Sequence, residues 1–173
     1  NITRAIKRAS GDGEAGDNLE EVIYEGYGPG GGAILLQALT TNRNRTAADV
    51  RSAFSRGGGH LGESGCVAWN FETKGLITVA MGDEAEGEEM GLLAIDAGAE
   101  DVELEDGLLE IYTAPDRLLE VRRALEAEGA APGSVEISKV PKSTLPLGEK
   151  EAEQTLKLLD SLEDLADVQK AYT

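Results

Sequence analysis

The chain has 173 residues and a net charge of −17, with 33 acidic against 16 basic side chains. Its hydrophobic content of 40% suffices for a packed core and excludes a wholly disordered chain. One cysteine and one histidine exclude an internal disulfide framework and a Cys/His zinc site. The acidic balance excludes a protein that wraps duplex DNA with its whole surface, because neutralising phosphates requires cations.

The longest uncharged run, residues 26–42, is interrupted by glycines and a proline, and only Ala33–Thr40 remains as a solid apolar block. That block is far too short to span a bilayer. No signal peptide is visible, although the chain begins with Asn1 and not with Met. We therefore expect a soluble protein of a reducing compartment, with no membrane partner, no metal and no cofactor.

The acidity is concentrated in the middle of the chain. Residues 66–140 carry eighteen acidic and five basic side chains, whereas residues 1–65 carry eight and seven, and residues 141–173 carry seven and four. This asymmetry predicts a separate domain with its own surface role. The alternative is an acidic surface that serves solubility alone.

Hydrophobic periodicity predicts the elements of the first segment. Residues 2–9 are expected to be the tail of a helix, which leads into a glycine-rich loop. Leu19–Tyr27 and Ala33–Thr40 are expected to be strands joined by a turn over Gly26–Gly32. Thr46-Ala-Ala-Asp49 resembles a capping box, which predicts that a helix begins there and ends at Gly57–Gly59.

The pattern of the middle segment predicts five strands and two helices. Strands are expected at Cys66–Phe71 and Leu76–Met81 around a Lys74-Gly75 turn, then a helix over 83–97, a hairpin of Asp101–Glu105 and Leu108–Thr113, a helix from Pro115 to Gly129, and a strand at Val135–Val140. From Leu76 onward the order is β-α-β-β-α-β, which is typical of ferredoxin-like domains.

The end of the chain predicts a proline-containing linker, a helix over Glu149–Leu165 and a strand at Val168–Tyr172. The first segment is too short to cover its own sheet, and this last helix and strand supply what it lacks. We therefore predict an α+β chain of two α/β domains, one of them discontinuous. The expected bounds are 1–11 for the end of an N-terminal helical domain, 12–65 with 141–173 for the discontinuous domain, and 66–140 for an inserted acidic ferredoxin-like domain.

The run from Gly26 to Gly31 satisfies the pattern G-x-G-x-x-G. Dinucleotide binding requires a helix directly after these glycines, but an apolar strand follows here. The preferred interpretation is a tight hairpin turn whose glycines adopt positive φ angles.

Asn42-Arg-Asn-Arg-Thr46 lies immediately before the expected helix. Cations at a helix N-terminus oppose the helix dipole, so Arg43 and Arg45 indicate an anion such as a phosphate at this position. Arg51 and Arg56 extend the positive charge along the helix. The alternative is that these arginines pair with Glu63 or with the acidic insert.

Two further groups of residues bear on function. His60 and Cys66 could form a nucleophile and its base, but Cys66 begins an apolar stretch and no orienting group is evident, so an enzyme is disfavoured. Glu103, Glu105 and Glu110 are expected on one face of the inserted sheet. That face would repel RNA, so it is either solvated or a dock for a basic protein surface.

Four motifs carry a specific resemblance. They are Tyr24-Glu-Gly-Tyr-Gly-Pro-Gly-Gly31, Asn42-Arg-Asn-Arg-Thr46, Val50-Arg-Ser-Ala-Phe-Ser55 and Gly58-Gly-His-Leu-Gly62, and later segments at 97–102 and 167–172 agree with them. The chain resembles the YebC/PmpR family along its whole length. By the resemblance, residues 1–9 are expected to be the end of the family's basic N-terminal helical domain, and the rest of that domain is not expected within this sequence. The motif turns implied by the resemblance are Gly26, Gly28, Pro29, Gly30, Gly31, Asn42 and Asn44.

The resemblance implies a non-enzymatic, cytoplasmic regulator of gene expression, of the DNA-binding transcriptional type. Other members act in translation, through the ribosome or its RNA, including relief of ribosomes stalled on proline stretches. Mitochondrial members, which a eukaryotic protein would join, activate translation of cytochrome c oxidase subunit I. The expected partners are DNA or ribosomal RNA, the ribosome, or a basic protein. The residues expected to contact nucleic acid are Arg4, Lys7, Arg8, Arg43, Arg45, Arg51 and Arg56.

Overall fold

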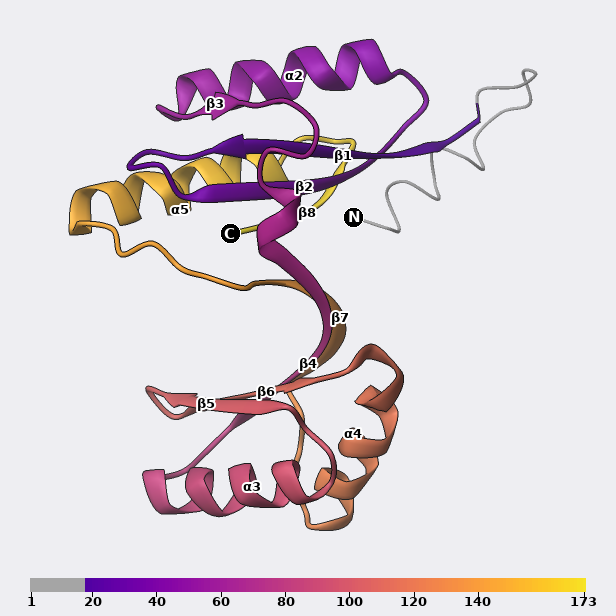
Figure 1. Ribbon diagram of the computed structural model, residues 1–173, viewed down its shortest axis with the longest axis vertical. Helices are drawn as coiled ribbons and strands as arrows, with labels where there is room; N and C mark the ends of the chain where they lie inside the picture. Colours follow the sequence, from indigo (N-terminus) through magenta and orange to yellow (C-terminus); the bar gives the residue numbers. More distant parts are fainter. Residues whose placement is uncertain (1–17) are drawn as a thin grey trace. The chain divides into compact units, whose positions relative to one another are not determined.

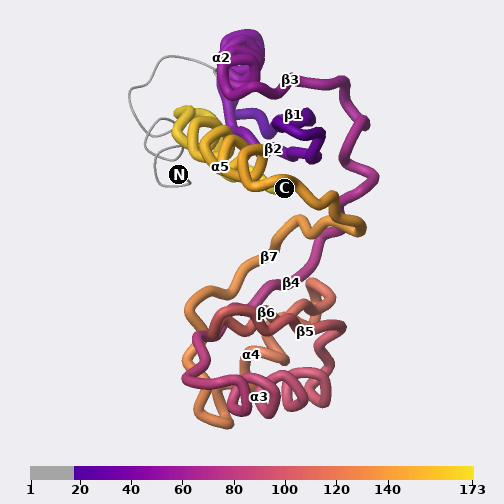
Figure 2. The backbone as a smooth tube through the Cα atoms, turned by 90° about the vertical axis from the view of Figure 1, so that its left-hand side faces the viewer, coloured from indigo at the N-terminus to yellow at the C-terminus, as the bar shows by residue number. Residues whose placement is uncertain are grey.

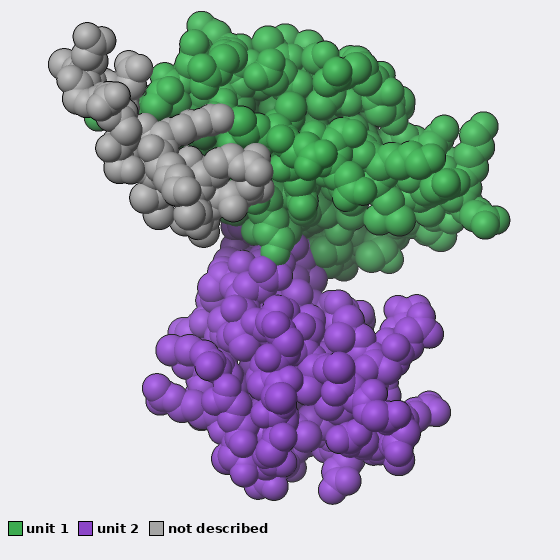
Figure 3. All heavy atoms as spheres, turned by 180° about the vertical axis from the view of Figure 1, so that it is seen from behind, with its two compact units in different colours: residues 1–71, 141–173 green, residues 72–140 purple. Residues whose placement is uncertain are grey.

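The computed structural model describes residues 18–173, which form two compact units. Unit 1 combines the chain up to Phe71 with Pro141–Thr173, and unit 2 is Glu72–Val140 (Figure 3). The change of unit thus comes six residues after the expected boundary at residue 66. The expected helix over 2–9, with Arg4, Lys7 and Arg8, lies outside the described residues.

Unit 1 contains a four-stranded sheet in the order β3-β1-β2-β8. Its strands are β1 (Glu20–Tyr27), β2 (Ala33–Thr40), β3 (His60–Leu61) and β8 (Val168–Tyr172). Strand β8 pairs antiparallel with β2, so that Leu36 faces Ala171 across the ladder. This confirms the prediction that the end of the chain completes the sheet of the first hairpin.

Helices α2 (Arg43–Arg56) and α5 (Glu149–Glu163) cover one face of this sheet (Figures 1 and 2). Ile34 and Leu36 of β2 point to this face and share a buried cluster with Phe54 of α2 and Leu158 of α5. These four side chains are fully buried. The opposite face of the sheet carries a smaller cluster of Leu35, Val67, Phe71 and Tyr172.

Unit 2 is a four-stranded sheet in the order β5-β6-β4-β7 with two helices on one face (Figure 1). Its elements are β4 (Phe71–Ala80), α3 (Glu84–Asp96), β5 (Asp101–Glu105), β6 (Leu108–Thr113), a short 3-10 helix (Pro115–Arg117), α4 (Leu118–Ala127) and β7 (Ser134–Pro141). Ile77 and Ile111 of the sheet pack on Ala94 of α3 and Val121 of α4. The β-α-β-β-α-β order and this layering confirm the predicted α+β fold with a ferredoxin-like insert.

The expected strand at Cys66–Phe71 and the turn at Lys74-Gly75 are wrong. Residues Ala68–Asn70 form a 3-10 helix, and β4 runs without interruption through Gly75. The buried Glu25 carboxylate accepts backbone N–H groups from this segment, which holds it in a turn instead of a strand. Gly75 permits close packing, since a Cβ there would lie 2.3 Å from Thr113 Oγ1.

The glycine-rich stretch forms the turn between β1 and β2. The Gly28 N–H donates to the Gly32 carbonyl at 2.8 Å, and Gly30 and Gly31 have φ angles of 84° and 91°. Strand β2 begins directly afterwards, at Ala33. The interpretation as a hairpin turn is therefore confirmed.

Candidate nucleic-acid interface

Helix α2 begins one turn earlier than the sequence predicted. Asn42 is the N-cap, and its side chain accepts a hydrogen bond from the Arg45 N–H at 3.1 Å. The capping box at Thr46 is therefore wrong, because Thr46 lies within the helix and is buried. Arg43 and Arg45 consequently belong to the first turn of α2, at the positive end of its dipole.

A buried polar cluster joins the start of α2 to the end of the chain. The Thr46 hydroxyl lies 2.7 Å from Thr40 Oγ1 and 2.8 Å from Asp167 Oδ2. Asp167 also accepts a hydrogen bond from Arg45 Nη2 at 3.3 Å, and its side chain is only 8% exposed. An anion therefore does stand beside Arg45, and it is supplied by the protein itself.

Arg43 has a weaker partner. Its Nε atom lies 3.8 Å from Glu20 Oε2, and both side chains are more than half exposed. The Tyr24 hydroxyl donates to the Arg43 carbonyl at 3.4 Å. Burial raises the pKa of Tyr24, and the positive charge of Arg43 opposes this rise. Arg43 and Arg45 therefore pair with Glu20 and Asp167 and not with the alternative partner Glu63.

Arg51 and Arg56 lie on the exposed side of α2, opposite Val50, Ala53 and Phe54, which face the core. Neither arginine makes an ion pair within residues 18–173. Asn44 is also exposed on this side. The solvent-facing surface of α2 thus carries two cations without an ion-pair partner among residues 18–173, and Arg43 and Arg45 mark the N-terminal end of the same helix.

The predicted acidic face exists on the sheet of unit 2. Glu103 of β5 stands directly opposite Glu110 of β6, and Asp101 stands opposite Tyr112. The Tyr112 hydroxyl donates to Glu110 Oε2 at 2.9 Å. Burial, this hydrogen bond and the neighbouring carboxylates raise the pKa of Tyr112. Glu105 is exposed on the same strand as Glu103.

The residues considered for catalysis make structural contacts. The His60 ring lies 5.3 Å from the Tyr27 ring, centre to centre. Cys66 is half-buried, and its carbonyl accepts hydrogen bonds from Tyr27 and Trp69. Across the described part of the chain, no three His, Cys, Asp or Glu side chains are arranged to hold a metal ion. No helix in residues 18–173 has the length and apolarity to cross a membrane.

Sequence reasoning missed the buried carboxylates of Glu25 and Asp167. Glu25 accepts backbone N–H groups of Gly65, Val67 and Ala68 at 2.5, 3.1 and 2.6 Å. A glutamate in an alternating strand gives no local signal of burial, because its donors lie 40 or more residues away. Asp167 likewise meets Thr46 across 121 residues.

Comparison with known proteins identifies the chain. Residues 19–173 match the family model described as the second and third domain of TACO1/YebC. The chain is 49% identical to the "Probable transcriptional regulatory protein STH1004" of Symbiobacterium thermophilum, over 100% of its own length and 72% of that protein. It is 52% identical to the "Probable transcriptional regulatory protein DehaBAV1_0421" of Dehalococcoides mccartyi, over 98% of its own length and 66% of that protein.

A solved structure supports the same assignment. The crystal structure of the conserved hypothetical protein Aq1575 from Aquifex aeolicus is 45% identical and superposes with a TM-score of 0.80. The match covers 99% of this chain and 70% of the Aquifex chain. The chain therefore belongs to the TACO1/YebC family and corresponds to its second and third domains.

Proposed function

We propose that the chain is part of a non-enzymatic regulator of gene expression that contacts nucleic acid through the exposed side of α2. The observation that carries this proposal is the pair Arg51 and Arg56, which are exposed and make no ion pair within the described residues. Guanidinium groups in this condition are available to phosphates at little cost, because no ion pair with another described residue has to be broken.

Arg43 adds to this surface, since its contact with Glu20 is long and solvent-exposed and therefore weak. Arg45 contributes less, because it already serves the buried Asp167 carboxylate. Arg51 and Arg56 are therefore expected to contribute most to nucleic-acid binding, Arg43 less and Arg45 least. Duplex DNA is the first candidate ligand, because the curated relatives are named as transcriptional regulatory proteins. A cytoplasmic location follows from that role in a bacterium.

A translation factor that acts at the ribosome is the second candidate. Unit 2 carries eighteen acidic and five basic side chains, and the face around Glu103 and Glu110 would be repelled by the backbone of a nucleic acid. A ribosome offers basic proteins beside its RNA, so it could accommodate both the arginines of α2 and the acidic face of unit 2.

The experiment compares two double variants of equal charge change. We expect Arg51→Ala/Arg56→Ala to weaken nucleic-acid binding by the full chain and to flatten its salt dependence by about one phosphate contact per arginine. The control is Arg122→Ala/Arg123→Ala on α4 of unit 2, which should change neither quantity substantially. Equal losses in both variants would show that net charge, and not the α2 surface, governs binding.

Parallel measurements separate the two candidates. Affinity for duplex DNA and co-sedimentation with ribosomes are measured at the same salt concentration. A transcriptional role predicts that the α2 variant loses DNA binding while Glu103→Gln/Glu110→Gln does not. A ribosomal role predicts that both variants reduce co-sedimentation.

A further inference from the structure

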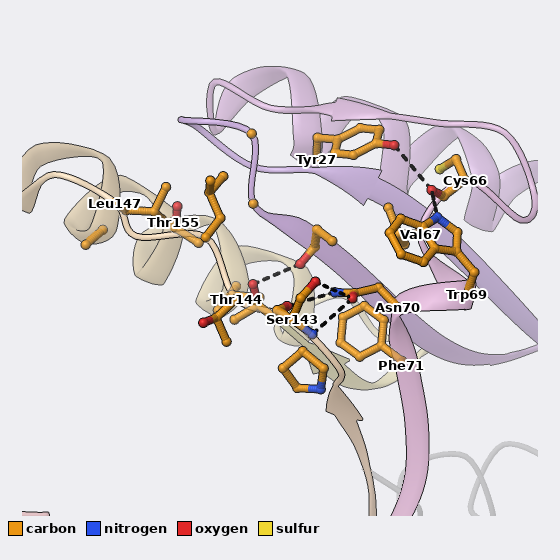
Figure 4. A pocket seen from close by; sticks show the side chains of 18 of the residues that line it. Tyr27, Cys66, Val67, Trp69, Asn70, Phe71, Ser143, Thr144, Leu147 and Thr155 are labelled. Atoms are coloured by element: carbon orange, nitrogen blue, oxygen red, sulfur yellow. Dashed lines mark hydrogen bonds between the residues drawn. The ribbon is translucent and has the colours of Figure 1, made fainter.

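Unit 1 contains an apolar pocket of about 600 Å³ beside α5 (Figure 4). Its walls come from the turn after β1, the segment 66–71, the segment 141–147 and α5. In Figure 4, Trp69 and Phe71 stand on one side of the pocket, and Leu147 and Thr155 on the other. None of the described residues that line it carries a charge, although 28% of the whole chain is charged.

Large hydrophobic side chains are exposed at this pocket. Trp69, Leu145 and Leu156 line it and remain 68%, 55% and 64% exposed. An apolar hollow ringed by exposed apolar side chains is a feature of binding surfaces, since isolated exposed leucines are common but clusters are not.

Most polar side chains of the lining already make hydrogen bonds within unit 1. The Trp69 Nε1 atom donates to the Cys66 carbonyl at 2.9 Å, and the Tyr27 hydroxyl donates to the same carbonyl. Asn70 and Ser143 bond to each other through both side chain and backbone. Small-molecule sites usually offer a few available polar groups that orient the ligand. This lining instead suits apolar side chains. A helix is a suitable carrier of such side chains, because its backbone groups are hydrogen-bonded within the helix and need no partners from the pocket.

The surface of α5 next to Leu156 carries negative charges that favour a basic partner. On α5, Leu156 is flanked at helical spacing by Glu149, Glu153, Asp160 and Glu163, which we call the acidic stripe. All four are exposed, although Glu153 contacts Lys157 at 3.4 Å and Glu163 accepts the Ala171 N–H at 3.3 Å. We propose that the pocket and the acidic stripe together bind a basic amphipathic helix of a partner protein, its apolar face in the pocket and its cations along the stripe. A second copy of the chain is a poor occupant, because two molecules of net charge −17 repel each other.

The single tryptophan of the chain makes this proposal directly measurable, because Trp69 lies at the pocket. The probe is a synthetic helix-forming peptide with leucines at spacings of three and four and lysines elsewhere, without tryptophan or tyrosine. On titration into the full chain we expect a saturable shift of Trp69 emission to shorter wavelength. A peptide with the same leucines and glutamates in place of lysines should bind at least tenfold more weakly.

Matched variants locate the binding site. Leu156→Gln and, independently, Leu145→Gln should each weaken binding at least tenfold, and both positions are exposed enough for the fold to survive. Leu92→Gln is the control, because Leu92 of α3 is 69% exposed but lies in unit 2. Glu153→Gln/Asp160→Asn should weaken binding and reduce its salt dependence. Arg51→Ala/Arg56→Ala should leave peptide binding unchanged, which separates this site from the proposed nucleic-acid interface.

Several results would overturn the proposal. One is an unshifted Trp69 emission at saturating peptide. Another is equal binding by the Leu156→Gln and Leu92→Gln variants. A concentration-dependent dimer that Leu156→Gln abolishes would show that a second copy occupies the pocket. Resistance of Trp69 to acrylamide quenching in the free chain would show that the ring is already covered.

Discussion

Arg45 and Asp167 lie 122 residues apart in the sequence, yet the Arg45 Nη2 atom is 3.3 Å from Asp167 Oδ2. The carboxylate is almost fully buried and also accepts the Thr46 hydroxyl. Arg45 therefore compensates a buried charge, although at the first turn of α2 its own charge opposes the helix dipole. This contact makes the two arginines of the Asn42–Thr46 motif unequal.

We expect Arg45→Ala to lower the free energy of unfolding by about 0.5–1 kcal/mol, because it removes a half-exposed partner from a buried carboxylate. Arg43→Ala should change it by less than about 0.5 kcal/mol, since the contact of Arg43 with Glu20 is long and exposed. Urea denaturation of the two single variants measures both values. If Arg45→Ala instead stabilised the protein, the unfavourable interaction of Arg45 with the helix dipole would outweigh its contact with Asp167.

Thr46 is expected to be the most sensitive residue of this motif. Thr46→Val keeps the shape but removes the hydroxyl shared with Thr40 and Asp167. Leaving those buried groups without this partner should cost about 1–3 kcal/mol. Thr46→Ser retains the hydroxyl and should recover most of this loss. Thermal unfolding of both variants measures the difference. Equal melting temperatures for the two variants would contradict the hydrogen-bonding role.

The sequence predicted those elements whose signals are local. The Asp106-Gly107 turn is an example: both residues have positive φ angles, as a tight hairpin between β5 and β6 requires. Gly75 is also a glycine, but it does not form a turn. It lies inside a continuous strand, where the absence of a side chain makes room for Thr113 and Leu118. A glycine that serves packing looks like a turn signal until its neighbours are known.

The candidate site was predictable only in part. The arginines of α2 stand out by charge and spacing, and the structure places Arg51 and Arg56 on its exposed side. Which arginine is engaged by the fold depends on Asp167, and that contact is set by how β8 pairs with β2. Long-range pairing of this kind leaves no periodic trace in the sequence. The start of α2 was missed for a smaller reason, since both Asn42 and Thr46 are acceptable N-caps.

Two glycine substitutions should distinguish steric from conformational cost. A Cβ at Gly26 would lie 2.6 Å from the His60 carbonyl and 2.8 Å from the Phe54 ring, so Gly26→Ala should cost about 1–3 kcal/mol through overpacking. Gly65 has a φ of 91° and open space around it, so Gly65→Ala should cost about 1–2 kcal/mol through backbone strain.

Asparagine separates the two mechanisms, because it tolerates a left-handed backbone better than alanine but is larger. Gly65→Asn should be more stable than Gly65→Ala, and Gly26→Asn less stable than Gly26→Ala. The same order at both positions in urea denaturation would contradict this division.

Glu25 is expected to hold the segment that carries Trp69. Its buried carboxylate accepts hydrogen bonds from three backbone N–H groups. In Glu25→Gln an NH2 group replaces one of the two oxygens, so a donor faces a backbone donor and that hydrogen bond is lost. We expect a loss of about 2–3 kcal/mol in the free energy of unfolding. The emission anisotropy of Trp69 in the native state should fall as well. Glu21→Gln on the same strand is the control, because Glu21 is exposed and should change both quantities little. An unchanged anisotropy in Glu25→Gln would show that the segment is held by other contacts.

Tyr112 should make the protein sensitive to alkali. Its pKa in the folded state is raised by burial, by its hydrogen bond to Glu110 and by the nearby carboxylates, whereas an unfolded tyrosine titrates near pH 10. A raised folded pKa means that the stabilising contribution is complete below about pH 10 and is lost as the pH rises further. We therefore expect the difference in unfolding free energy between the wild-type chain and Tyr112→Phe to shrink between about pH 10 and pH 12.

Tyr24 and Tyr27 titrate in both chains, so the difference isolates Tyr112. Glu110→Gln removes one of the charges that raise the pKa, and its stability should depend less steeply on pH in this range. Parallel curves for the wild type and Tyr112→Phe would show that the phenol is not coupled to the acidic face.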